Sequence, residues 1–225
     1  MTVTYIHHSG FLVESRKFYY LFDYESGNLP ELNPEKPIFV LSSHSHGDHY
    51  NPAIFSRLPG MQVRAVLSGD ISAPQGIDTL SVDPNREYSL GPGQRLTTFR
   101  STDLGVAFLL EEEDGLLYHA GDLNDWVWEG EPENWNRDMT AAYRKEIDLL
   151  AQTLEGRTLD MAFVVLDPRQ EADYARGMAY FLNHIQAEAV YPMHYWDDPS
   201  IIETFLREYP QYTQFIAHCA ERGHL

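Results

Sequence analysis

The sequence is poor in cysteine and in cations, and each shortage excludes a class of protein. Its single cysteine, Cys219, cannot form an intramolecular disulfide, so the fold makes no use of an oxidising compartment. Lys and Arg number 16 against 34 Asp and Glu, and the resulting net charge of −18 repels the phosphate backbone of nucleic acids. A nucleic-acid partner is therefore not expected, although bound divalent metals would reverse the sign locally.

Long apolar runs are also missing. No segment approaches the roughly 18 apolar residues that a membrane-spanning helix needs, and Met1–His8 has neither the basic nor the apolar region of a signal peptide. We therefore expect a cytoplasmic protein with no membrane partner. The 225 residues are 43% hydrophobic, which is enough for a large core, and no linker or repeat divides them. Residues 1–225 are expected to form a single domain.

The first half of the chain has β-strand patterns. Thr2–His7, Gly10–Glu14 and Lys17–Tyr24 are short and rich in β-branched or aromatic residues, and Pro37–Ser42 is a continuous apolar run typical of a strand buried on both faces. A short helix is predicted over Asn51–Leu58. Further strands are predicted at Gln62–Leu67 and, within a β-rich stretch from Asp78 to His119, at Arg86–Leu90, Gln94–Arg100, Gly105–Glu112 and Gly115–His119.

The second half alternates helices with strands. One helical face is predicted from Met139, Tyr143, Ile147, Leu150 and Leu154, and another from Ala175, Met178, Ala179 and Leu182. The remaining elements are strands at Met161–Leu166, Ala189–Pro192 and Thr213–Ala217 and a helix at Ile201–Tyr209. A β-rich half followed by this alternation predicts two sheets faced by helices.

Four side chains that can bind metal follow the buried strand Pro37–Ser42 within six positions: His44, His46, Asp48 and His49. Because alternate residues of an extended backbone project the same way, His44 and His46 can share one metal. Asp48 and His49 come where the chain turns, with Gly47 at the bend, and can face a second metal. The alternative is a chance surface cluster, which the total of only 10 histidines argues against.

The pattern His44-x-His46-x-Asp48-His49 resembles the HxHxDH signature of the metallo-β-lactamase superfamily. Ile6–Glu14 and Leu21–Asp23 are similar to opening strands of the branch that includes ascorbate-6-phosphate lactonase. The resemblance spans residues 6 to 195. It implies a four-layer αβ/βα sandwich, with helices flanking two mixed sheets and metals at one edge between the sheets, and it implies that homo-oligomers can form.

The resemblance implies two further ligands. His119-Ala-Gly-Asp122 is similar to the motif whose aspartate bridges two metals, and the segment around His194 resembles the one that supplies the last histidine. The alternatives are a turn aspartate and a satisfied core histidine. His119 itself is expected to be structural, and His8 is expected to line the site without being a ligand.

One family histidine is missing, because none occurs from Tyr50 to Tyr118. Asp103 is the predicted substitute and Ser101 the second choice. A carboxylate there would make Mn²⁺ or Fe more plausible beside Zn²⁺, the metal that we expect first. The alternatives are a loop-capping Asp103 and a mononuclear centre, so the prediction is one or two divalent ions.

Three residues are candidates for substrate binding. Trp126 belongs to Asn124–Arg137, a stretch expected to be a loop, which holds three of the four tryptophans and starts just after the bridging aspartate. Tyr195 directly follows a ligand, and Arg169 could bind a phosphate or carboxylate. The alternatives are a loop fastened to the core by its aromatics and a salt bridge of Arg169 to another carboxylate.

The resemblance implies a metal-dependent hydrolase. A metal-bound hydroxide would cleave an ester, lactone or phosphoester of a small-molecule substrate, and Asp48 would bind metal, orient the nucleophile and shuttle a proton. One alternative is a phosphodiesterase or nuclease of the same superfamily, which the charge argues against. Another is a degenerate, non-catalytic metal-binding member, which the missing histidine favours.

Overall fold

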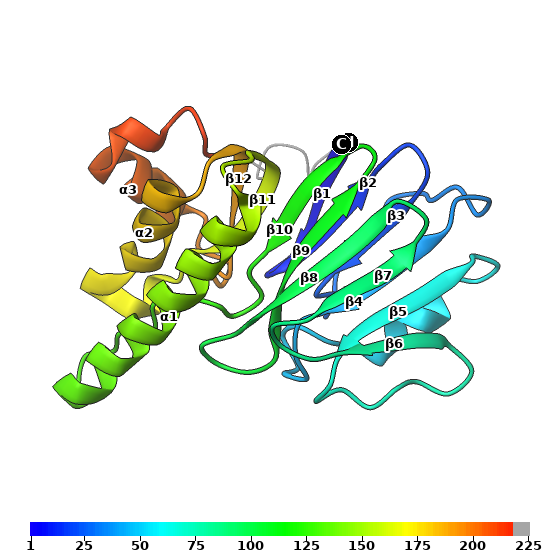
Figure 1. Ribbon diagram of the computed structural model, residues 1–225, viewed down its shortest axis with the longest axis horizontal. Coiled ribbons are helices and arrows are strands. Elements are labelled where there is room, and N and C mark those ends of the chain that lie inside the picture. The colour runs from blue at the N-terminus through cyan, green and yellow to red at the C-terminus, as the bar shows by residue number, and fades with distance from the viewer. Residues whose placement is uncertain (218–225) are drawn as a thin grey trace.

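Two six-stranded mixed sheets lie face to face in the computed structural model, which describes residues 1–217 (Figure 1). The first sheet contains, in spatial order, β1 (Thr2–His7), β2 (Gly10–Glu14), β3 (Tyr19–Phe22), β4 (Ile38–Ser42), β5 (Val63–Ser68) and β6 (Asp78–Val82). Strands β1 to β3 pair antiparallel, and β3 to β6 pair parallel. Strand β6 is additional to the strands that the sequence predicted individually.

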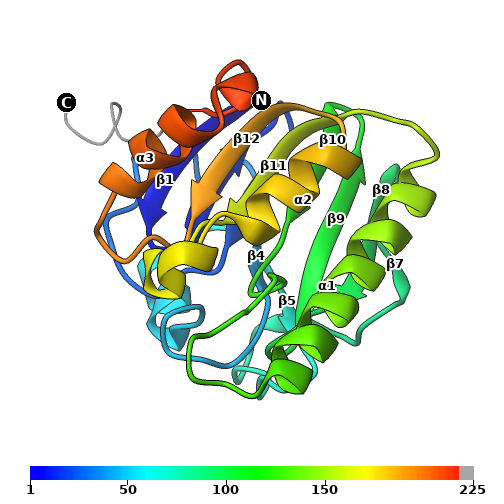
Figure 2. The same ribbon diagram turned by 90° about the vertical axis from the view of Figure 1, so that its left-hand side faces the viewer.

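The second sheet is built from the later strands. In chain order they are β7 (Glu87–Gly91), β8 (Gln94–Arg100), β9 (Val106–Glu112), β10 (Gly115–His119), β11 (Leu159–Val165) and β12 (Ala187–Met193), and they keep that order across the sheet. Strands β7 to β10 pair antiparallel, and β10 to β12 pair parallel. Helices α1 (Glu133–Leu154) and α2 (Arg176–His184) cover its outer face, with α3 (Ser200–Glu208) beside them (Figure 2).

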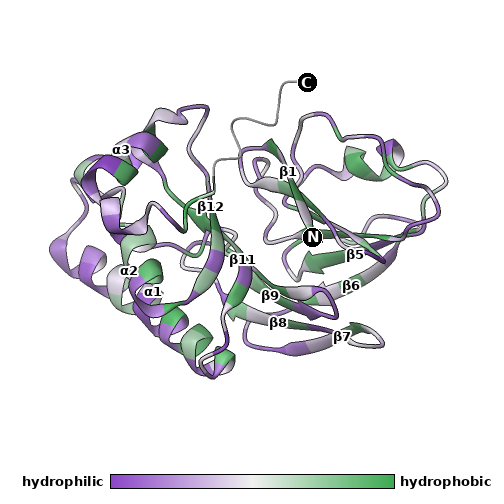
Figure 3. Ribbon diagram, turned by 90° about the horizontal axis from the view of Figure 1, so that it is seen from above, coloured by the Kyte–Doolittle hydropathy of each residue, from purple (hydrophilic) through white to green (hydrophobic). Residues whose placement is uncertain are grey.

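Period-two alternation explains why the sheets stack. Phe11 and Phe22 point between the sheets, where their ring centroids lie 4.5 Å and 6.0 Å from that of Phe163 on β11. The alternate residues Leu12 and Leu21 pack on the outer side, in a cluster with Ile54 and Leu58. Strands such as β5 and β9 are accordingly coloured as hydrophobic, whereas the edge strand β7 is mainly hydrophilic and α1 carries both hydrophilic and hydrophobic residues (Figure 3). The four-layer αβ/βα sandwich is confirmed.

The outer layer of the first sheet is thin. The helix predicted over Asn51–Leu58 is a 3-10 helix, Pro52–Arg57, whose first free N–H, that of Ala53, donates to the Asn51 side chain at 3.0 Å. No helix within residues 1–217 has the length and hydropathy needed to cross a membrane.

Two predictions of local structure are wrong. Thr213–Ala217 is not a strand, because its contact with the sheet is a single bridge between Val190 and Ile216. The expected loop Asn124–Arg137 ends early, because α1 begins at Glu133. The predicted apolar face of α1 is buried as expected at Tyr143, Ile147, Leu150 and Leu154.

Close contact between the sheets fixes where β4 ends. A Cβ on Gly105 would lie 2.0 Å from the carbonyl oxygen of Ser43, and one on Gly121 would lie 2.6 Å from the Ser43 Cβ. Both glycines also have positive φ, +72° and +52°. The Val106 N–H donates to the same Ser43 carbonyl at 2.9 Å. Glycine thus permits the approach that sets the position of the adjacent His44.

Gly47 differs from these glycines, because nothing in its surroundings requires glycine. A Cβ there would meet nothing within 4 Å, and its φ lies outside the left-handed range.

Gly105→Ala should lower the free energy of unfolding by about 3 kcal/mol or more, whereas Gly47→Ala should change it by less than about 1 kcal/mol. Urea unfolding followed by circular dichroism measures both. Equal losses in the two variants would contradict the steric account.

Candidate metal centre

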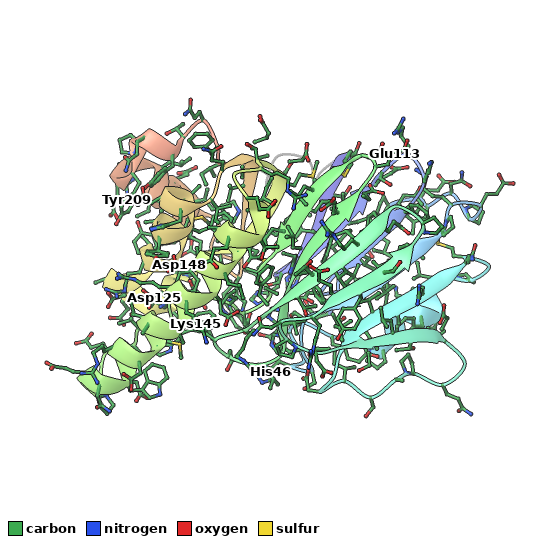
Figure 4. The ribbon with its side chains drawn as sticks, viewed as in Figure 1. His46, Glu113, Asp125, Lys145, Asp148 and Tyr209 are labelled. Atoms are coloured by element: carbon green, nitrogen blue, oxygen red, sulfur yellow. The ribbon has the colours of Figure 1, made fainter. Side chains whose placement is uncertain are left out.

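Metal-ligating side chains meet where strands of both sheets end. His46 lies at the edge of the molecule opposite Glu113, which marks the β9–β10 turn (Figure 4). The ligand atoms form two groups, each with its atoms within 4.8 Å of one another. The first group contains His44, His46, Asp103 and Asp122, and the second contains His8, Asp48, His49 and His194. All seven predicted ligands are therefore brought together, and His8 joins them.

Asp122 lies between the two groups. Its Oδ1 is 3.0 Å from His49 Nε2 and 3.4 Å from His194 Nε2, while its Oδ2 is 3.5 Å from His44 Nε2. Each carboxylate oxygen thus faces the histidines of a different group. Such an arrangement allows one carboxylate to contribute to two metal ions.

Several ligand atoms are buried without a hydrogen-bond partner among the described residues. They are Nε2 of His8, His49 and His194 and Oδ1 of Asp122; His49 Nε2 and Asp122 Oδ1 lie 3.0 Å apart as an ion pair but do not form a hydrogen bond of normal geometry. A buried polar atom left unpaired costs about 1–3 kcal/mol, so four in one place require an explanation. Nitrogen and carboxylate donors converging on one point suit a divalent cation, which would satisfy all of them. The centre therefore binds divalent metal.

A buried aspartate orients the ligands that follow β4. Asp23 accepts the Ser43 N–H and hydroxyl, both at 2.7 Å, and the Nδ1–H of His49 at 2.8 Å. The Ser43 Oγ in turn accepts Nδ1–H of His44 at 2.9 Å. Both imidazoles are thereby held with Nε2 directed at the centre. The sequence places Asp23 in a strand that resembles one of the family, and that pattern does not predict this role.

A second carboxylate, Asp167, orients the other end of the site. Its Oδ2 accepts Nδ1–H of His194 at 3.0 Å and the indole N–H of Trp196 at 3.3 Å. Arg169 donates to both Asp167 oxygens through Nε at 3.0 Å. The expected salt bridge of Arg169 therefore exists. The signal for Asp167 was its place two residues after the buried strand β11.

His8 is the ligand candidate that the sequence analysis missed. It was expected only to line the site, yet its ring is 5% exposed, with its centroid 4.2 Å from that of His194. A φ of 51° at the β1–β2 turn directs the side chain inward. Its neighbour His7 pairs instead with Glu25 at the surface. Two adjacent histidines at a turn were the available signal.

The first group is more open than the second. The side chains of His46 and Asp103 are 50% and 48% exposed, with Nδ1 and Oδ2 3.5 Å apart. Ser101, the second-choice ligand, caps the loop instead, because its Oγ accepts the Asp103 N–H at 3.1 Å. His119 is structural as expected: Nε2 donates to the Ser9 carbonyl at 2.9 Å.

The pKa shifts of Asp122 and His8 suit their roles as metal ligands. Burial raises the pKa of Asp122, but the nearby His49 and His194 outweigh it and hold that pKa well below its ordinary value. Burial, reinforced by His194 and His49, lowers the pKa of His8 to about 3. Asp122 is therefore ionised and His8 neutral at pH 7, which are the forms that bind metal.

A pocket of about 270 Å³ opens onto the centre. Trp126 and Arg169 line it, as predicted for substrate contacts. Trp126 is also fastened to the core, since its indole N–H donates to the Asp122 carbonyl at 2.9 Å. Tyr195 lies outside the lining of this pocket: it is 5% exposed and stacks on Tyr5 at 5.7 Å, so its contact with substrate stays a prediction.

Removal of single ligands should change metal content in a graded way. Asp122→Ala should abolish tight metal binding, because Asp122 faces both groups, whereas His46→Ala and Asp103→Ala should each remove about one equivalent, because each belongs to one group alone. Elemental analysis after dialysis measures all three. Asp138→Ala, a change of an exposed carboxylate, is the matched control. Wild-type metal content in Asp122→Ala would contradict the shared-carboxylate geometry.

Comparison with known proteins agrees with the geometry. The family described as "Beta-lactamase superfamily domain" matches residues 2–134, more than half of the chain. A UPF0173 metal-dependent hydrolase of Desulforamulus reducens is 31% identical over 143 residues, which are 54% of this chain and 62% of the relative. The match thus spans less than two thirds of that relative's length.

Solved structures share the fold. Igni18, a metallo hydrolase from the archaeon Ignicoccus hospitalis, is 16% identical with a TM-score of 0.63, covering 96% of this chain and 93% of its own. CmlA, a diiron β-hydroxylase from Streptomyces venezuelae, is 13% identical with a TM-score of 0.62, covering 95% of this chain and 52% of its own. With the family match and the two-sheet fold, these findings show that the chain belongs to the metallo-β-lactamase superfamily.

Proposed function

We propose that this protein is a metal-dependent hydrolase that cleaves an ester, lactone or phosphoester in a small molecule. The single observation that carries the proposal is the position of Asp122 between two ligand groups at the floor of a pocket. The relative from Desulforamulus reducens, named a metal-dependent hydrolase, supports the same activity. The likeness to the ascorbate-6-phosphate lactonase branch stays a prediction.

Bound divalent metal would supply two things: a lowered pKa for water, and polarisation of the oxygen that becomes negative. The residues of the chain do the rest. Asp48 lines the pocket, and its Oδ2 lies 3.7 Å from His8 Nε2. A carboxylate oxygen of Asp48 is placed to accept the proton of the attacking water and return it to the leaving group. Trp126 and Trp128, whose ring centroids lie 5.8 Å apart, cover one side of the pocket and exclude water there.

We propose Zn²⁺ as the first candidate metal, with Mn²⁺ or Fe as alternatives. The second group is rich in imidazole, which suits Zn²⁺. The first group contains two carboxylates, Asp103 and Asp122, and carboxylate oxygen favours harder ions. The two ligand groups would therefore prefer different metals, because their donor atoms differ.

The substrate is proposed to be a small molecule and not a nucleic acid. The pocket holds about 270 Å³, below the 300–1,000 Å³ typical of ligand sites. The net charge of −18 opposes a polyanion. A cytoplasmic location, the lack of a membrane partner and homo-oligomer formation stay predictions.

Hydrolysis of model substrates tests the proposed function. Protein loaded with Zn²⁺, Mn²⁺ or Fe²⁺ should cleave dihydrocoumarin, phenyl acetate or bis(4-nitrophenyl) phosphate, and Asp48→Asn should lower kcat by about 10²-fold or more because proton transfer is impaired. Activity that persists after chelation and dialysis would contradict the proposal. A tight, salt-sensitive affinity for single-stranded RNA would instead favour the nuclease.

A further inference from the structure

A rigidly held guanidinium lines the pocket. Arg169 donates from Nη2 to Asp167 Oδ2 at 2.5 Å, in addition to its two bonds through Nε. Its guanidinium carbon lies 4.4 Å from the ring centroid of Trp196 and 5.8 Å from that of Trp128. One edge of the group is thus bonded and its face is stacked. Its direction is therefore set before any ligand arrives.

The opposite edge of this guanidinium is available to a ligand. Within residues 1–217, Nη1 of Arg169 donates no hydrogen bond, and Nη2 donates only to Asp167. The side chain is 48% exposed and lines the pocket. The N–H groups that remain on Nη1 and Nη2 form a planar fork. Such a fork matches the two oxygens of a carboxylate.

Asp167 neutralises Arg169 only in part, because it serves two donors. The same Oδ2 accepts from Nη2 of Arg169 at 2.5 Å and from Nδ1 of His194 at 3.0 Å. Among the described residues that line the pocket, Arg169 is the only lysine or arginine, and Asp48 and Asp103 line it too. Apart from bound metal, an anion in this pocket would meet this one cation, whose planar fork fits the two oxygens of a carboxylate.

The position of Arg169 also indicates the rest of the ligand. Because Arg169 and His194 share one oxygen of Asp167, the fork lies beside the second ligand group. Trp135 and Met139, from the first turns of α1, line the same pocket. Trp135 is 37% exposed and offers an apolar surface to a ligand.

We propose that the substrate carries a carboxylate that binds the free edge of Arg169 and a compact apolar group that packs on Trp135. The inference rests on the proposed function, since it names the substrate class of the same pocket. A carboxylate gripped there fixes the orientation of the molecule, and the bond to be cleaved lies between the carboxylate and the ligand groups. Arg169 then determines specificity for carboxylate-bearing substrates.

Binding of non-reactive probes tests this inference without turnover. Calorimetry of metal-loaded protein would compare 3-phenylpropanoate with 3-phenylpropanamide, its neutral isostere. Wild type should bind the carboxylate about tenfold tighter or more, as expected for a charge-assisted hydrogen bond. Arg169→Gln should reduce the ratio to about twofold or less. Arg144→Gln, which removes an arginine outside this pocket, should leave the ratio unchanged.

Two results would overturn the inference. An unchanged ratio in Arg169→Gln would mean that the carboxylate binds elsewhere in the site, and a tighter affinity for 2-phenylethylphosphonate would assign the fork to phosphate. If Arg169→Gln loses metal, Arg169→Lys replaces it; this variant keeps a cation without the planar fork and should retain a reduced preference. A ratio in metal-loaded Arg169→Lys equal to that of wild type would also overturn the inference.

The two proposals fail in different ways. Carboxylate preference without hydrolysis of any ester, lactone or phosphodiester would contradict the proposed function and leave the binding inference standing. Hydrolysis together with equal affinity for both probes would support the proposed function and contradict the binding inference. Metal content measured on each sample separates a change in recognition from a change in the centre.

Discussion

The metal centre depends on one interaction, the approach of the buried Asp122 carboxylate to three histidines. Its oxygens lie 3.0 Å from His49, 3.4 Å from His194 and 3.5 Å from His44. Removed from water, such a group is costly unless cations compensate it. Each histidine also has its Nδ1 bonded elsewhere, which leaves Nε2 directed at the centre. The whole arrangement is organised around divalent metal.

The fold supplies this centre by bringing the two sheets together at one edge. Gly105 and Gly121 allow the backbone near Ser43 to approach the second sheet. Asp23 then orients the ligands from the first sheet, and Asp167 orients the one that follows β12. Fixed partners of this kind keep the ligand atoms in place before metal arrives, which lowers the cost of binding. The same Asp167 connects the centre to Arg169 and so to the pocket.

Sequence patterns predicted the features that depend on local periodicity. Alternation predicted most strands and the shared side of His44 and His46, and a resemblance predicted Asp122 and His194. The failures occur where the backbone leaves regular geometry. Positive φ values at His8, His194 and Trp196 break alternation, so His8 turns inward and Tyr195 turns into the core. Helix α1 has no side-chain cap at its first turn, and its beginning was therefore missed.

Metal stoichiometry of the wild-type protein tests the central claim most directly. Untagged protein, purified without chelator and soaked with Zn²⁺, Mn²⁺ or Fe²⁺, would be dialysed and analysed for metal per chain. Two ligand groups, with Asp122 of the first also facing His49 and His194 of the second, predict close to two equivalents. About one equivalent would mean that the exposed group around Asp103 does not hold a metal, and the binuclear account would be wrong. None would contradict the metal centre itself.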